Sequence, residues 1–133
     1  MKQYLNIKKK NADNTNAIME DHQVFWAFSQ EQLEQGKAKI GITDNKELTS
    51  IGMGGFLPKA KADGLFLAIE QENKRYRKEL RAAKEAKEQA IAYELSNHEA
   101  YYTGDIQPVV ELFAGLYTQK DILAVYLKQS KKQ

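Results

Sequence analysis

Hydrophobic and polar positions alternate along this chain mostly at helical spacing. Residues from about 59 to 97 are rich in Ala, Glu, Lys, Leu and Arg, which have high helix propensity, and this predicts helix throughout. The apolar stripe is interrupted, because a cluster at 65–69 is followed by the polar stretch 70–75 before a second stripe over 76–93. The pattern predicts either one long helix or two helices that meet near Asn73.

A capping signal predicts another helix after residue 29. Ser29 has Gln32 three residues later, which is the spacing of a capping box, so the helix is expected to start at Gln30. Lys37 and Lys39 precede Gly41, and lysines suit the negative end of a helix dipole. The helix is therefore expected to end near Gly36 or Gly41.

Three further helices are expected from weaker signals. Residues 2–19 have an apolar start, but the asparagine-rich stretch 11–16 competes for backbone hydrogen bonds, so this helix is predicted either to continue or to break there. A proline at its start and a glycine at its end predict a short helix over 108–115. Thr118 is a candidate cap for a last helix over 119–128.

Two segments have the composition of strands. Residues 23–28 are short, apolar and aromatic, and residues 48–57 contain two short apolar runs joined by glycines. Strands set between helices predict an α+β fold, which is a helix-dominated single domain over 1–133 with a small antiparallel sheet. The basic end of the chain, 128–133, is expected to fray.

Composition narrows the class of protein only modestly. The 133 residues carry 20 basic and 18 acidic side chains, and a net charge of +2 is too small to indicate nucleic-acid binding by itself. There is no cysteine, which excludes disulfides and thiolate chemistry. Apolar runs are too short for a membrane span, and the start of the chain lacks a signal-peptide core, so we expect a cytoplasmic protein without a cofactor or a metal.

One polar motif could carry chemistry. Glu94 and His98 are four residues apart in a predicted helix and therefore share a face, as a general base and its orienting carboxylate would. If the pair held a metal, a third ligand would be needed, for which Asp105, Asp21 and His22 are the candidates. The alternative is structural, because a histidine in the last turn of a helix is stabilised by the helix dipole.

The glycines at 52, 54 and 55 form the second motif. Backbone amides at a glycine-rich junction before a helix can bind phosphate, but Gly52, Gly54 and Gly55 match neither a Walker loop nor the dinucleotide-binding fingerprint. We therefore predict a structural turn that uses the conformational freedom of glycine. A coupled alternative is that the turn requires glycine because His98 or its neighbours Asn97 and Tyr93 pack against its backbone.

Aromatic side chains are candidates for a binding surface. Alternation along a strand would direct Phe25 and Ala27 to one face and Trp26 and Phe28 to the other. Either the aromatic strand is core, or Trp26 is exposed and anchors a partner. Tyr101 and Tyr102 form a second aromatic edge near His98, and they too are expected either to pack in the core or to bind a partner.

The two ends of the chain are basic. If they lay together they would form one patch able to contact phosphates, which makes nucleic acid a candidate partner. The lysines concerned are Lys8, Lys9, Lys10, Lys128, Lys131 and Lys132.

Three of these segments, taken together, resemble a family of small uncharacterised proteins encoded by bacteriophages and conjugative elements. The resemblance implies a genetic setting rather than a reaction, and that setting favours accessory roles such as inhibiting a host factor or modulating a defence system. The matching pieces are 25–29 with Glu31, Gln32 and Gly36, then 50–56, and then 93–99 with Thr103 and Asp105.

The leading hypothesis is a non-enzymatic accessory protein of a mobile element that binds a host or element-encoded protein. No catalytic constellation is evident from spacing alone, whereas an aromatic anchor and a charged helical face are available. The alternatives are a nucleic-acid-binding protein that uses the basic ends, and a small metal or acid–base enzyme centred on Glu94, His98 and Asp105.

Overall fold

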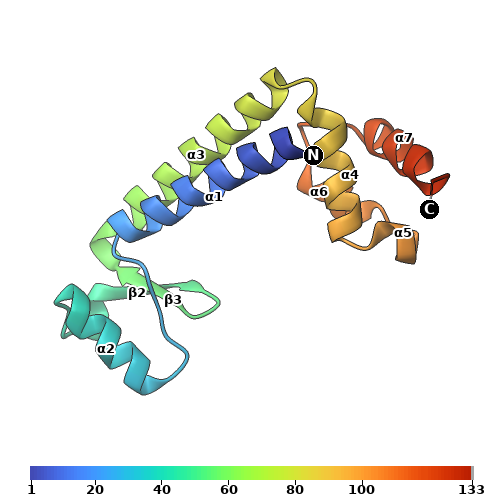
Figure 1. Cartoon of the computed structure of the whole chain (residues 1–133). Helices are drawn as coiled ribbons and strands as arrows, with labels where there is room; N and C mark the ends of the chain where they lie inside the picture. The colour runs from blue at the N-terminus through green and yellow to red at the C-terminus, as the bar shows by residue number, and fades with distance from the viewer. Residues whose placement is uncertain (133) are drawn as a thin grey trace. The chain divides into compact units, whose positions relative to one another are not determined.

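The computed structural model describes residues 1–132 and shows a helix-dominated α+β protein with one small sheet (Figure 1). This confirms the predicted fold class. In chain order the elements are α1 (Lys2–Asp21), β1 (Phe25–Trp26), α2 (Gln30–Ile40), η1 (Asn45–Glu47), β2 (Leu48–Gly52), β3 (Gly55–Pro58), η2 (Lys59–Lys61), α3 (Ala62–Ala82), α4 (Ala86–Asn97), α5 (Ala100–Thr103), α6 (Gln107–Leu112) and α7 (Gln119–Ser130).

The contacts within the chain group the residues into two compact units. Unit 1 combines Met1–Lys10 with the residues from Arg75 onward, and unit 2 is the continuous segment Asn11–Lys74. The helices α1 and α3 contribute residues to both units, whereas the sheet belongs to unit 2 and α4 to α7 belong to unit 1.

The core of unit 1 is built around α4. This helix packs against α5, α6 and α7, and its Ala90, Ile91 and Leu95 are fully buried. Tyr4 and Ile7 from the start of α1 join the same core. The first turns of the chain are therefore held by residues that lie some 90 positions later, as the bond from the Tyr4 hydroxyl to Glu94 shows.

The sheet of unit 2 is antiparallel with strand order β1-β3-β2. The central strand places Phe56 opposite both Phe25 of β1 and Ser50 of β2. Strand β1 is shorter than the predicted 23–28, because only Phe25 and Trp26 pair with β3. At its start, Gln23 has a positive φ of 60° in the turn that follows α1. Strands β2 and β3 match the predicted segment 48–57, except that β3 extends one residue further, to Pro58.

The long helical region forms two helices, but they meet at 83–85 and not near Asn73, which lies inside α3. Leu80, Ala86 and Ala90 are all buried in one core. In a continuous helix Leu80 and Ala86 would lie about 120° apart around the axis, because each residue turns the helix by about 100°. The break after α3 allows both to face the core.

Helix α1 continues through the asparagine-rich stretch where a break was considered. The side chain of Asn14 does not compete for the helix backbone, because its Nδ2 donates to the buried Glu72 of α3 at 3.0 Å. The same two helices also contact each other within unit 1, where Lys10 of α1 and Glu79 of α3 form an ion pair at 3.5 Å.

Two of the predicted caps are confirmed. The Ser29 side chain accepts from the backbone of Gln32, and α2 ends at Gly41. Thr118 and Asp121 form a reciprocal capping box at the start of α7. This last helix extends through Ser130, beyond the predicted end at 128, and of the terminal segment 128–133 only Gln133 lies outside the described residues.

Candidate functional site

The glycine motif is the turn of the β2–β3 hairpin. Gly52 pairs with Gly55, which leaves Met53 and Gly54 as a two-residue loop with φ values of 53° and 85°. Positive φ at both positions is typical of a type I′ turn. The predicted structural turn is therefore present, and a strand follows it instead of the helix N-terminus that a phosphate-binding junction would need.

The rings of Trp26 and Phe28 lie against this turn. A Cβ atom placed on Gly54 would be 2.4 Å from Cε1 of Phe28, and one placed on Gly55 would be 2.8 Å from Cζ3 of Trp26. The backbone amide of Ala27 also donates to the carbonyl of Gly54, at 2.8 Å. Positive φ at positions 52 and 54 favours glycine, and the side chains closest to Gly54 and Gly55 are those of Phe28, Ile51 and Trp26. This corrects the alternative that His98 or its neighbours impose glycine.

Three large apolar side chains are exposed at this hairpin. Trp26 is 50% exposed, Phe28 is 76% exposed and Met53 is 93% exposed. We call these three residues the aromatic hairpin face. Phe25 instead stacks on Phe56, with ring centroids 5.9 Å apart. The predicted alternation along the first strand is therefore confirmed, and Trp26 and Phe28 are on its exposed side.

Met53 was not singled out by the sequence analysis, although the sequence contains the signal for it. Glycines on both sides of a two-residue turn place the intervening side chain at the tip of a hairpin, where no core can cover it. A non-glycine residue at positive φ also costs about 1–3 kcal/mol, and such strain clusters at functional sites. Met53 combines exposure, apolarity and backbone strain in one position.

The surroundings of this face have a defined charge. Residues 48–57 carry no charged side chain, and the segment 29–35 that follows Phe28 contains Glu31 and Glu34 but no Lys or Arg. Both glutamates are exposed, and the Phe28 backbone amide donates to the Gln32 side chain at 2.8 Å. The aromatic hairpin face is therefore an uncharged apolar tip beside a helix start that carries Glu31 and Glu34, the second of which pairs with Lys37 at 3.4 Å.

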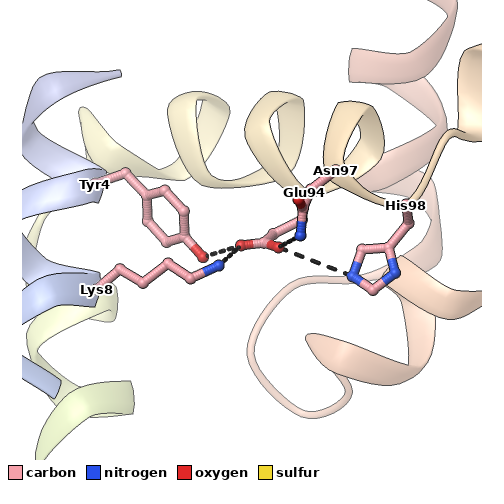
Figure 2. Close-up of polar contacts among 5 residues, drawn as sticks. All are labelled: Tyr4, Lys8, Glu94, Asn97 and His98. Carbon is pink, nitrogen blue, oxygen red and sulfur yellow. Dashed lines mark hydrogen bonds and ion pairs between the residues drawn. The ribbon is translucent and has the colours of Figure 1, made fainter. Parts of the chain in front are cut away.

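The second candidate is a buried carboxylate in unit 1 (Figure 2). Glu94 of α4 is 1% exposed, and its Oε2 accepts from the Tyr4 hydroxyl at 2.6 Å and from Lys8 Nζ at 2.7 Å. Its other oxygen lies 3.5 Å from Nδ2 of Asn97 and 3.8 Å from Nε2 of His98. Lys8 also lies over the ring of Tyr93, 4.9 Å from its centroid.

This arrangement is better suited to holding α1 against α4 than to catalysis. Spacing correctly predicts that Glu94 and His98 share a face, but at 3.8 Å they form a loose ion pair at most, and only when the imidazole is protonated. His98 is the C-cap of α4, as the structural alternative stated.

Asp105 does not complete a metal site with this pair. Its carboxylate accepts from the backbone of Gln107 at the start of α6. Among residues 1–132, no group of three His, Cys, Asp or Glu residues could hold a metal ion.

Burial changes the acidity of several tyrosines. It raises the pKa of Tyr117 to about 12, and it also raises the pKa values of Tyr4, Tyr76 and Tyr101. For Tyr4 the hydrogen bond to Glu94 acts in the same direction, because it stabilises the protonated phenol.

These shifts predict a loss of stability in alkali. Above pH 10, the ordinary pKa of tyrosine, the unfolded chain releases phenolic protons that the folded chain retains. The free energy of unfolding is therefore expected to fall between pH 10 and about pH 12. Denaturant unfolding across this range would measure the fall, and Tyr117→Phe should make it shallower. An equal slope in this variant would contradict the assignment.

The basic ends are largely engaged in ion pairs. Lys8 pairs with Glu94, Lys10 with Glu79 at 3.5 Å, and Lys128 with Glu88 at 2.7 Å. Lys9, at the surface of α1, is also engaged in a polar or electrostatic contact. Lys131 and Lys132 follow α7 and are exposed. These pairs neutralise half of the lysines that the nucleic-acid alternative requires.

The two neighbouring tyrosines differ in their surroundings. Tyr102 is 92% exposed on α5, as a binding residue would be. Tyr101 is half-buried and stacks on Tyr126 of α7, with ring centroids 5.5 Å apart. Tyr101 therefore packs α5 against α7, and of the pair Tyr102 alone is available to a partner.

Comparison with known proteins places the chain in a family. The profile described as "Family of unknown function (DUF7659)" matches residues 3–132. The chain belongs to this family. No curated protein and no solved structure matches the chain. Within residues 1–132, no helix of this DUF7659 protein is long and apolar enough to cross a membrane.

Proposed function

We propose that this DUF7659 protein is a non-enzymatic binding protein that contacts a partner protein through the aromatic hairpin face. The observation that carries the proposal is the exposure of Trp26, Phe28 and Met53 at one strained hairpin turn. Clusters of exposed large apolar side chains mark interaction sites, and aromatic residues dominate binding energy at interfaces.

The charge around the face indicates the kind of partner. Glu31 and Glu34 lie beside an uncharged tip, so the complementary surface is an apolar pocket with basic residues at its rim. The resemblance to proteins of bacteriophages and conjugative elements supports a cytoplasmic host or defence protein as this partner, which binding would occlude.

Photo-crosslinking in a bacterial host lysate tests the proposal. A photoreactive phenylalanine analogue at position 28 should crosslink to one defined protein, which is then purified and its binding measured directly. The matched control is the same analogue at Phe66, which is 58% exposed on α3 in the same unit. Equal products at both positions, or none at position 28, would contradict the proposal.

The variant Met53→Asn separates binding from folding. Asn followed by Gly is the favoured pair for a type I′ turn, so this change should leave the free energy of unfolding equal or higher. It removes the apolar tip, however, and should weaken binding of the purified partner at least tenfold, as expected of a hot-spot residue. Unchanged affinity would show that the tip is not the contact.

A further inference from the structure

A cationic pocket lies in unit 1 at the junction between α3 and α4. One wall comes from the end of α3 and the start of α4, and the other from the segment that joins α6 to α7. Its volume is about 380 Å³, within the range of about 300–1,000 Å³ typical of small-molecule sites. The lining residues are Leu80, Arg81, Lys84, Lys87, Leu116 and Tyr117.

The polar lining is positively charged. Arg81 donates to the carbonyl of Gly115 at 3.2 Å, which fixes its guanidinium across the junction. Lys87 pairs with Asp121 at 3.1 Å and is thereby held over the ring of Tyr117. Lys84 has no side-chain hydrogen bond or ion pair to any residue among 1–132. The six lining residues therefore include three cations and no carboxylate, and the nearby acidic side chains are Asp121, which pairs with Lys87, and Glu85, which precedes α4.

The backbone adds to this potential. Helix α4 starts at Ala86 beside Lys84 and Lys87, and its N-cap residue Glu85 makes no capping hydrogen bond through its side chain. The N-terminus of a helix is the positive end of its dipole and favours anions, although the first two amides of α4 are already engaged, because those of Ala86 and Lys87 donate to the carbonyls of Ala83 and Lys84 at 2.9 and 3.3 Å. The helix start and the three side chains therefore act in the same direction.

The remaining lining is apolar. Leu80 is 1% exposed and Tyr117 is 7% exposed, so both form solid walls of the pocket. The Tyr117 hydroxyl is itself buried and inaccessible from the pocket, so the wall that Tyr117 contributes is apolar. A ligand for this pocket would thus need an anionic group beside an apolar or aromatic one.

We propose that the cationic pocket binds a small phosphate-bearing molecule with an attached apolar or aromatic group, of the class to which mononucleotides belong. Phosphate is the anion favoured by several point charges together with a helix N-terminus. This inference does not depend on the proposed function, because the aromatic hairpin face lies in unit 2.

Amide chemical-shift titrations of the full chain test this inference. Adenosine monophosphate is the probe, and inorganic phosphate and adenosine are added in separate arms. We expect saturable shifts confined to residues 80–88 and 114–118, with the monophosphate binding more tightly than either fragment. The absence of saturation at millimolar monophosphate would overturn the proposal. Equal affinity for either fragment would also overturn it, because the walls or the cations would then contribute nothing.

Two charge-removing variants give the control. Lys84→Gln should weaken monophosphate binding about tenfold, the loss expected when a charged contact is removed. Lys78→Gln removes the same charge from an exposed position on α3 that does not line the pocket and should leave affinity unchanged. Equal weakening by both variants would show general attraction to a basic surface and would overturn the proposal.

Discussion

Replacing Glu94 with Ala is expected to lower the free energy of unfolding by about 3 kcal/mol. The substitution leaves the buried Tyr4 hydroxyl without its acceptor at 2.6 Å and Lys8 without its partner at 2.7 Å. A buried donor without a partner loses its hydration without compensation, which is the main source of the cost. Denaturant unfolding followed by circular dichroism would measure the change.

The matched control is Glu88→Ala on the same helix. Glu88 also pairs with a lysine at 2.7 Å, but its side chain is 52% exposed and that of Lys128 is 57% exposed. Exposed ion pairs contribute about 0–1 kcal/mol, so this variant should be nearly as stable as the parent protein. Equal losses in the two variants would show that burial of Glu94 does not determine the energetics of the cluster.

Replacing Gly54 with Val is expected to cost unit 2 about 3 kcal/mol. Two effects add, because Val disfavours the φ of 85° and its Cβ would lie 2.4 Å from the Phe28 ring. Trp26 is the single tryptophan of the chain and lies beside this turn, so its fluorescence reports unfolding of the hairpin.

Gly52→Val separates the two effects. Gly52 has a nearly equal φ of 87° in the same hairpin, but a Cβ there would meet no atom within 4 Å. This variant should cost only the backbone strain, about 1–2 kcal/mol. If Gly54→Val costs no more than Gly52→Val, then contact with Phe28 is not a reason for glycine at position 54.

The features that sequence predicted correctly are those set by neighbours along the chain. Ser29 and Thr118 are caps because a side chain reaches the backbone amide three residues later, whatever the rest of the fold does. The shared face of Glu94 and His98 is also a consequence of local spacing. The alternation around Trp26 follows from strand geometry in the same way.

The features that sequence did not predict depend on contacts between distant segments. The break at 83–85 arises because one core buries both Leu80 and Ala86, a fact that no local propensity encodes. The role of Glu94 depends on Tyr4, which is 90 residues away in the chain. For the same reason, spacing could suggest Asp105 as a partner of His98, whereas its carboxylate accepts from the backbone amide of Gln107 at the start of α6.

The division of the chain has a consequence for protein synthesis. Unit 2 is one continuous segment, so all of its residues have been polymerised before Arg75 is added. Unit 1 needs both the first ten residues and the later helices, and Tyr4 must wait for Glu94 to be translated. Because domains generally fold as units during synthesis, we expect the nascent chain to form its hairpin first. Residues 1–10 would then remain without their packing and hydrogen-bond partners until α4 emerges.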